Sequence, residues 1–386
     1  MLNGAAGETL GIYVHIPYCL RKCAYCGFLS RPIDGRAADY AAFIAQEAVL
    51  RSDEAVAPCD TLFLGGGTPS LLPCGDIAAI IEAARRHLRL SPDAEITMEI
   101  NPETVTSEKA GAWARAGINR ASVGAQAFSE RLLALLGRGH DRHAPKHAIA
   151  MLRAAGVERL SLDLMYGLPE QSLDDWKQTL DEALSCGVSH LSCYALSLEE
   201  ASPLWHEVEA GRLTLPDEDA VADQLEYAAA RLEAEGYTRY EISNFAREGE
   251  QCRHNLHYWR MDGWIALGCG AHGQRPAGVH YENHADETAW RRDIMKGQKP
   301  EHQAMDEGLD GLCLNAVMMG LRLAEGIDCR TILRKTGMDV GVLYEKGIEK
   351  AMARGLLWGQ QGRLGPTPLG MNLQNTLLLE VLDDAL

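Results

Sequence analysis

The chain has 386 residues, of which 46% are hydrophobic and 24% are charged, so it can bury a large core and has room for two or three domains. Its formal net charge of −17 excludes a general nucleic-acid or anionic-membrane binder, because binding to phosphate groups needs a positive surface. We find no basic segment followed by an apolar one at the N-terminus and no run of about eighteen apolar residues, so we expect no secretory signal, no membrane span and a cytoplasmic location.

Short β-rich runs alternate with helical stretches from residue 11 to about residue 200. The helical stretches 37–55, 76–88 and 172–187 place apolar residues at helical spacing. Repeated β–α units build a parallel sheet with helices outside it, so we predict an α/β fold with a partial, six-unit TIM-like barrel. The six strands are expected at 12–17, 61–67, 95–100, 120–126, 160–169 and 190–196.

The remainder of the chain shows weaker patterns. A helix is predicted at 217–236, whereas the Gly-, His- and Trp-rich stretch 249–290 has no clear period and is interpreted as mostly loop. Residues 308–386 predict helices, two short strands and a final helix, an order typical of a small winged-helix-like α+β domain. Acidic residues outnumber basic ones in 301–386, which favours a structural or protein-docking role over DNA binding.

Polar residues, glycines or a cysteine stand at or just after the ends of several predicted strands. They are Cys19, the glycines 65–67, Glu99 and Gln126, and Asp163 lies within the fifth strand. In βα barrels the carboxyl ends of the strands meet at one rim, and active sites are built there. We therefore expect these side chains to meet at one site.

Three cysteines, Cys19, Cys23 and Cys26, stand within eight residues just after the first predicted strand. Thiolates select zinc or iron–sulfur clusters, and a structural zinc site needs four ligands. His15 could complete a zinc site, but it lies within the apolar strand and no second pair of ligands follows. A [4Fe–4S] cluster held by three cysteines leaves one iron with an open position, which accounts for the missing fourth ligand.

This cysteine spacing, with Tyr25 before the last cysteine, resembles the signature of the radical S-adenosylmethionine (SAM) superfamily. The resemblance implies a [4Fe–4S] cluster on Cys19, Cys23 and Cys26, with the methionine part of SAM on the open iron. It also implies that the segment "GGGTPS" holds the amino group of SAM. The residues that it assigns to SAM binding are Tyr13, Tyr25, Gly66, Gly67, Thr68, Glu99, Gln126, Arg138 and Asp163.

Within this superfamily, nearly the whole chain resembles the branch that contains the HemN and HemW families. HemN enzymes carry a further cysteine two residues after the third one, where this chain has Phe28. HemW proteins carry a His-Asn-x-x-Tyr-Trp motif, which stands here as "HNLHYW", His254 to Trp259. Both features favour the HemW family. This resemblance implies a division into a barrel at 1–245, a connecting segment at 246–300 and a HemN-like C-terminal domain at 301–386.

The HemW resemblance implies a heme chaperone that binds heme and transfers it to an acceptor protein. The acceptor considered is a respiratory enzyme, and a homodimer is the assembly considered. Imidazole is a common axial ligand of heme iron and aromatic rings can cover a macrocycle, so His254 is the first candidate ligand, with Tyr258 and Trp259 beside it. Cys252, His257 and His272 are rival ligands.

Other interpretations remain open at this stage. From the residues alone, "HNLHYW" is also typical of a packed segment in which His254 satisfies backbone groups and the aromatic rings fill the core. The alternative functions are an oxygen-independent coproporphyrinogen III dehydrogenase, which Phe28 disfavours, and a radical SAM heme-opening methyltransferase. A zinc-binding structural protein is a further alternative.

Overall fold

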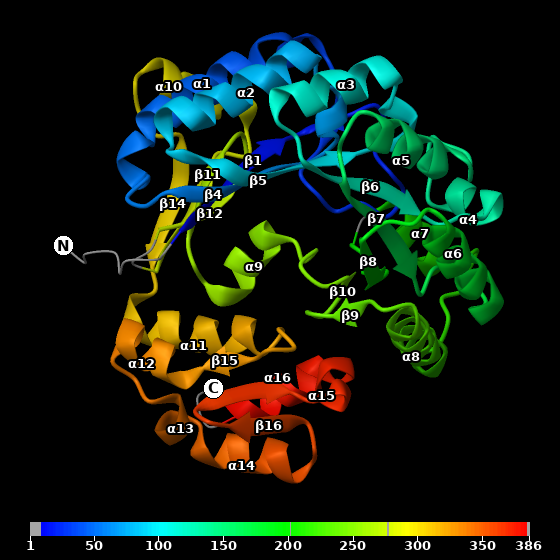
Figure 1. Cartoon of the computed structure of the whole chain (residues 1–386), viewed down its shortest axis with the longest axis vertical. Coiled ribbons are helices and arrows are strands. Elements are labelled where there is room, and N and C mark those ends of the chain that lie inside the picture. The colour runs from blue at the N-terminus through cyan, green and yellow to red at the C-terminus, as the bar shows by residue number, and fades with distance from the viewer. Residues whose placement is uncertain (1–8, 201, 276–277, 384–386) are drawn as a thin grey trace.

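The computed structural model describes residues 9–200, 202–275 and 278–383, and its main feature is a curved sheet lined on its outside by helices (Figure 1). Six strands of this sheet run parallel in the order expected for βα units. They confirm the six predicted strands: β1 (Leu10–Ile16), β4 (Cys59–Gly66), β5 (Leu90–Ile100), β6 (Arg120–Gln126), β7 (Arg159–Tyr166) and β8 (His190–Ala195).

The helices between these strands pack their apolar faces on the outside of the sheet, where most of the core lies. Local signals set where several of them begin. Ser172 and Asp175 form a capping box at the start of α6, and Thr106 and Asp217 cap α3 and α8. The layer consists of α1 (Tyr40–Leu50), α2 (Cys74–His87), α3 (Ser107–Ala116), α4 (Glu130–Leu135), α5 (Ala144–Ala154), α6 (Leu173–Ser185), α7 (Pro203–Glu209) and α8 (Glu218–Ala234).

The interpretation of 249–290 as mostly loop is wrong. This stretch contains a helix and three strands, and β11 pairs in parallel with β1, so the chain returns to the first edge of the barrel sheet. These strands have only three to five residues, too few to show an alternating pattern. The elements are α9 (Arg253–Arg260), β11 (Trp264–Leu267), β12 (His272–Gln274), β13 (Val279–Asn283), α10 (Glu287–Met295) and β14 (Glu301–Asp306).

The sheet stays open, with β14 at one edge and β9 (Thr238–Arg239) at the other, next to β10 (Asn244–Ala246). The six parallel strands therefore form a partial barrel, as predicted. Because β11 to β14 join the same sheet, residues 246–300 extend the barrel sheet. The domain boundaries at residues 245 and 300 stay a prediction.

A buried ionic group holds this added part of the sheet to α1. Arg51 is fully buried and its guanidinium contacts Glu47 at 3.0 Å, Glu54 at 3.1 Å and Glu301 at 3.0 Å. It also donates a hydrogen bond to Asn283 of β13 at 2.7 Å. Removing one partner of such a group leaves an uncompensated buried charge, so its members depend on one another.

The C-terminal part has its own core and a three-stranded sheet, as the predicted winged-helix-like α+β domain requires. In Figure 1 it lies below the open side of the barrel. Its elements are α11 (Gly308–Gly320), β15 (Ile327–Asp328), α12 (Cys329–Thr336), α13 (Val340–Leu343), α14 (Glu345–Ala353), β16 (Leu357–Gln360), β17 (Arg363–Pro366), α15 (Pro368–Asn372) and α16 (Gln374–Leu382).

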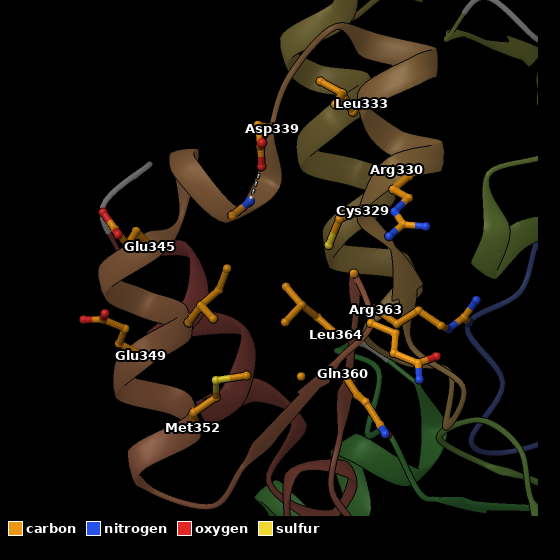
Figure 2. Close-up of a pocket in the computed structure, with 15 residues that line it drawn as sticks. Cys329, Arg330, Leu333, Asp339, Glu345, Glu349, Met352, Gln360, Arg363 and Leu364 are labelled. Carbon is orange, nitrogen blue, oxygen red and sulfur yellow. Dashed lines mark hydrogen bonds between the residues drawn. The ribbon is translucent and has the colours of Figure 1, made fainter.

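A groove of about 510 Å³ lies in this domain between α12, α14 and the hairpin of β16 and β17. Figure 2 shows acidic side chains of α14, Glu345 and Glu349, on one side of the groove and Arg330 and Arg363 on the other. Leu333, Met352 and Leu364 supply apolar walls. The charges around the groove are therefore mixed, without the basic surface that binding to phosphate groups needs.

Candidate functional site

A cavity of about 620 Å³ opens where the parallel strands end, and the three cysteines stand at its mouth. They lie on the cysteine loop, which we define as residues 19–31. The short strands β2 (Tyr18–Cys19) and β3 (Arg31–Pro32) pair in parallel and close the ends of this loop. Inside it, the amide of Ala24 donates to the carbonyl of Leu136 at 3.0 Å. The loop is thus fixed with Cys19, Cys23 and Cys26 half-buried and lining one cavity.

Two polar side chains approach the cysteine sulfurs. Thr68 Oγ1 donates to Cys19 Sγ at 3.5 Å, and Arg138 Nη1 donates to Cys23 Sγ at 3.5 Å. These contacts place one hydroxyl and one guanidinium within hydrogen-bond distance of two of the three sulfurs. Among the described residues, no group of three His, Cys, Asp or Glu side chains gathers closely enough to hold a single metal ion. A cube-shaped cluster binds each cysteine through a different iron, so it accepts a wider spacing than one zinc ion does.

The glycine segment after β4 passes directly beside the cysteine loop. The Gly67 amide donates to the Ile16 carbonyl at 2.8 Å, and a Cβ on Gly67 would come within 2.7 Å of the Tyr18 carbonyl oxygen. Gly66 has a φ of +110°, which favours glycine, and His15 packs against it. Only glycine fits at positions 66 and 67 without a shift of the neighbouring atoms. The backbone of Gly66, Gly67 and Thr68 is thereby exposed to the cavity.

Two acidic side chains are enclosed in the cavity wall. Glu99 Oε2 accepts a hydrogen bond from the Gly66 amide at 3.0 Å, and Asp163 accepts one from Ser122 Oγ at 2.7 Å. Burial, followed by the charge of Asp163, raises the pKa of Glu99 to about 8. Burial also raises the pKa of Asp163. Both side chains are half-buried where they line the cavity, and their charges repel. Such a pair favours a cationic ligand, because a positive charge between the acids offsets both desolvation and repulsion.

Gln126 and Arg138 form the wall between the acids and the cysteines. Gln126 has a φ of +66°, which is rare outside glycine, and its Oε1 accepts from Tyr194 Oη at 2.6 Å. Arg138 Nη2 donates to the Gly124 carbonyl at 2.6 Å and to Asn101 Oδ1 at 2.7 Å. The left-handed turn at Gln126 ends the strand and directs this side chain into the cavity. Tyr194 was not identified from the sequence as a residue of this site. Its position near the end of β8, where site residues are expected, could have indicated it.

The two predicted tyrosines have different positions. Tyr25 lines the cavity next to the cysteines. Tyr13 lies outside the cavity lining, and its Oη contacts His15 Nδ1 at 2.9 Å, while His15 Nε2 contacts the Leu29 carbonyl at 2.9 Å. Tyr13 is therefore placed to orient the cysteine loop through His15.

The "HNLHYW" segment forms helix α9, which enters the open side of the barrel (Figure 1). His254 is fully buried: its Nδ1 contacts Thr61 Oγ1 at 2.8 Å and its Nε2 contacts Tyr258 Oη at 2.8 Å. Its ring stacks on Phe63 with centroids 5.2 Å apart. Both ring nitrogens are occupied, so this arrangement does not support His254 as an axial heme ligand. The structure instead agrees with the interpretation of this segment as a packed one.

The other candidate ligands differ in their exposure. Cys252 and His257 are buried, and His257 Nε2 contacts Asp60 Oδ1 at 2.7 Å. Trp259 packs with Leu323 of the C-terminal domain. His272, the first residue of β12, is exposed. Of the four proposed ligands, only His272 is open to solvent.

The carboxyl of Glu99 predicts a pH-dependent stability of the protein without SAM. Its pKa is about 8 in the folded state against an ordinary value of 4.5. The folded state binds this proton more tightly, so the contribution to the free energy of unfolding is present below the ordinary pKa and is lost as the pH rises through about 8. We expect the urea midpoint to fall between about pH 4.5 and pH 8 and then to level off, and the Glu99→Gln variant to lose much of that fall.

Glu241 offers a control for this measurement, because burial raises its pKa to about 7 and neither Glu99 nor Asp163 is among the groups that shift it. The Glu241→Gln variant should keep the part of the fall that belongs to Glu99. Equal pH profiles for the unmodified protein and Glu99→Gln would contradict the prediction.

Comparison with known proteins identifies two matching regions. Residues 13–183 match the radical SAM superfamily, and residues 313–373 match the HemN C-terminal domain. The structure resembles that of coproporphyrinogen III oxidase (HemN) from Escherichia coli, with a TM-score of 0.83 and 20% sequence identity over 97% of this chain and 90% of that one. This likeness confirms the fold. No helix in the described residues is both long and apolar enough to cross a lipid bilayer.

Several relatives with higher sequence identity are named heme chaperone HemW. The heme chaperone HemW of Escherichia coli is 37% identical over 90% of this chain and 91% of its own length. The heme chaperone HemW of Mycobacterium tuberculosis is 34% identical over 97% of this chain and 95% of its own length. Identity of this level over nearly the full length, together with the cysteine loop and the "HNLHYW" segment, establishes that the chain belongs to the HemW family of the radical SAM superfamily.

Proposed function

We propose that this protein is a heme chaperone that also holds a [4Fe–4S] cluster and SAM. The observation that carries the proposal is the near full-length similarity to relatives named heme chaperones, in a chain that has Phe28 where HemN enzymes have a further cysteine. Phe28 is 70% exposed at the cavity mouth, so an apolar surface stands there instead of a thiol. The alternatives, a coproporphyrinogen dehydrogenase and a heme-opening methyltransferase, are not favoured by these relatives.

The radical SAM fold implies the cluster, and the cysteine loop fits it. Cys19, Cys23 and Cys26 supply three thiolates at one mouth, and Arg138 offsets their negative charge. When bound, the cluster supplies an electron that can cleave the sulfonium of SAM. The chain itself contributes a half-buried position, with the backbone of the Gly66–Gly67 segment and the ring of Tyr25 excluding water on either side.

SAM fits the wall that leads away from the cysteines. Its ammonium and sulfonium groups are cationic, and the half-buried acids Glu99 and Asp163 face the same cavity. Backbone of the segment 66–68 and the side chains of Gln126 and Arg138 provide further polar contacts. We propose these residues as the SAM site, with Tyr25 beside it and Tyr13 acting through His15.

Replacing Asp163 by asparagine should weaken SAM binding at least tenfold, about 1.4 kcal/mol, because it removes one buried negative charge and keeps the size of the side chain. Equilibrium dialysis with SAM on the protein with a reconstituted cluster measures this effect, and the iron content should stay unchanged. Asp174→Asn is a matched control, since Asp174 is exposed on α6. Equal SAM affinity in Asp163→Asn and Asp174→Asn would remove Asp163 from the site.

For heme, we propose a position on the rim of the cavity beside the cysteine loop. His272 is exposed, and the turn before it contacts the loop, because Gly270 lies against Leu29, where a Cβ would come within 2.1 Å of Leu29 Cδ2. Phe28 and Leu20 expose apolar side chains on the same loop. A neutral imidazole next to apolar side chains suits heme iron and the face of its macrocycle. We therefore place the axial ligand at His272.

The acceptor in this proposal is a protein, because a net charge of −17 suits a protein surface better than a nucleic acid. A respiratory heme enzyme is the first acceptor to test, and a homodimer is the first assembly to test by light scattering. The eleven cysteines are free thiols in the structure, which favours work in the reducing cytoplasm.

One anaerobic experiment tests the function. Protein with a reconstituted cluster is titrated with heme, and the complex is mixed with a heme-free respiratory enzyme whose activity reports heme arrival. We expect saturable heme binding and transfer to the acceptor, with no change to the heme. In a parallel assay with SAM and a reductant, coproporphyrinogen III should remain unchanged. Formation of protoporphyrinogen IX would overturn the chaperone proposal in favour of the dehydrogenase.

A further inference from the structure

The cavity continues past the acids to a polar floor near the opposite ends of the strands. In an ordinary βα barrel, layers of Val, Ile and Leu fill this space. Here the floor carries polar groups from β5, β6, β8, β10 and the start of α9, and the heme and SAM proposals use none of them. The floor residues are Thr97, Arg120, His190, Asn244, Cys252 and Asn255.

Arg120 is the main feature of this floor. It is 1% exposed, and its Nη1 donates to the Glu250 carbonyl at 3.0 Å. Its Nη2 has no hydrogen-bond partner among the described residues. Glu95, a buried acid in the same region, forms its ion pair with Arg159 at 2.9 Å. At longer range, the charges of Glu95 and Glu250 help to raise the pKa of Arg120. One buried nitrogen of this guanidinium therefore has no hydrogen-bond partner within the described chain, which is costly to stability and leaves it free to donate to a ligand.

Two more buried polar atoms on this floor lack partners within the described chain. Thr97 Oγ1 and Asn244 Oδ1 make no hydrogen bond, and both residues line the cavity. Thr97 lies directly beside Arg120 in the register of β5 and β6. His190 does not serve either of them, because its nitrogens contact Ser161 and Tyr240. Buried polar atoms are almost always satisfied in native proteins, so three unpartnered atoms on the floor of one cavity indicate a place for a polar ligand.

SAM at the mouth does not supply this partner. Arg120 begins β6 and Gln126 ends it, so their backbones are about 20 Å apart at ~3.3 Å per residue. The cysteines and Arg138 lie at the Gln126 end. Glu99 of the proposed SAM site lies nearer the floor, two residues along β5 from Thr97 or ~7 Å. With the methionine part of SAM on the open iron, however, its carboxylate lies at the cysteine end of the cavity.

We propose that Arg120, Thr97 and Asn244 form a subsite for the carboxylate of a second small ligand, bound deeper in the barrel than SAM. A guanidinium and a hydroxyl can both donate to one carboxylate, and the Asn244 amide can pair with a hydroxyl next to it. One cation balances one negative charge, and Glu99 and Asp163 already make the cavity acidic. A small hydroxy acid therefore fits better than phosphate. This inference goes beyond the proposed function and does not depend on heme binding.

Lactate is a suitable probe, with lactamide as its uncharged match. Each is added at constant ionic strength to protein with a reconstituted cluster and saturating SAM, and the thermal midpoint of unfolding is recorded. We expect lactate to raise the midpoint by several degrees and lactamide to leave it unchanged, because a ligand that binds only the folded state stabilises it. Arg120→Met should abolish the lactate shift, and Thr97→Val should weaken lactate binding about tenfold.

Arg120→Met also removes the hydrogen bond to the Glu250 carbonyl and the attraction to Glu95, so its ligand-free midpoint should fall whether or not a ligand binds. The deciding quantity is therefore the lactate shift, measured for each variant from its own ligand-free midpoint. An unchanged lactate shift in Arg120→Met would overturn the proposal. So would the absence of any lactate shift in the unmodified protein, or a shift with phosphate alone. Thr97→Val provides the same test if Arg120→Met does not fold.

Heme also carries carboxylates, so a second titration compares heme with its dimethyl ester. If heme and its dimethyl ester bind the unmodified protein equally well, and also bind Arg120→Met equally well, the heme propionates do not use the subsite. It then belongs to a free acid, as proposed. A preference for heme over the ester that disappears in Arg120→Met would overturn the free-acid assignment and give the subsite to a heme propionate.

Discussion

Single replacements of Cys19, Cys23 and Cys26 by serine are each expected to abolish the iron–sulfur cluster. A serine hydroxyl stays protonated at neutral pH and is a poor ligand for iron. The two remaining thiolates are too few to retain the cluster on the protein. Iron and sulfide contents after anaerobic reconstitution, with the visible absorbance of the cluster, measure the loss. The fold should survive, because all three cysteines are half-buried on a loop and contribute little to the core.

Cys252→Ser is the sharpest control for these variants. Cys252 lines the same cavity but lies on its floor, and its thiol donates to Glu95 Oε1 at 3.6 Å. This variant should keep the full iron and sulfide content. If it lost the cluster while Cys23→Ser retained it, the assignment of the cluster to the cysteine loop would be wrong.

The second large effect is expected at His272. Replacing this exposed imidazole by alanine removes the proposed axial ligand, so heme affinity should fall at least tenfold, about 1.4 kcal/mol, and the main absorption band of bound heme should shift. Heme titration followed by absorbance measures both quantities. His302→Ala is the matched control, because His302 is also exposed but lies on the edge strand β14.

His254→Ala should behave in the opposite way. It should leave the heme spectrum unchanged, and it should lower the free energy of unfolding by about 1–3 kcal/mol because the hydroxyls of Thr61 and Tyr258 lose their partner. Urea unfolding measures this second effect. A spectral change in His254→Ala with none in His272→Ala would return the ligand to helix α9.

The parallel strands could be predicted because each is a short β-rich run separated from the next by a stretch with helical spacing, and most end at a glycine, a cysteine or a polar residue. The cysteine loop could be predicted because its ligands are close in sequence. The added strands β11 to β13 could not, since each has five residues or fewer and its pairing partner is distant: β11 pairs with β1, about 250 residues earlier in the chain. Long-range pairing of this kind leaves no local pattern.

The floor of the cavity was equally hidden from sequence reasoning. Arg120 comes at the beginning of a strand, where barrel positions usually serve stability, and a single arginine is most often a solvated charge. Asn255 lies inside the "HNLHYW" segment, yet it lines the cavity while His254 turns toward Thr61. Which residue of a motif faces a ligand depends on how the helix is rotated, and this rotation is set by distant partners.

Helix α9 also ties the barrel to the C-terminal domain. On one side His254 bonds to Thr61 of the barrel, and on the other Trp259 packs with Leu323. A further barrel residue, Glu241, forms a β-bridge with Leu323. Because α9 cannot lose either neighbour without exposing buried surface, the two domains should melt together in one calorimetric transition, and the amide hydrogens of α9 should exchange with solvent only when the whole molecule opens.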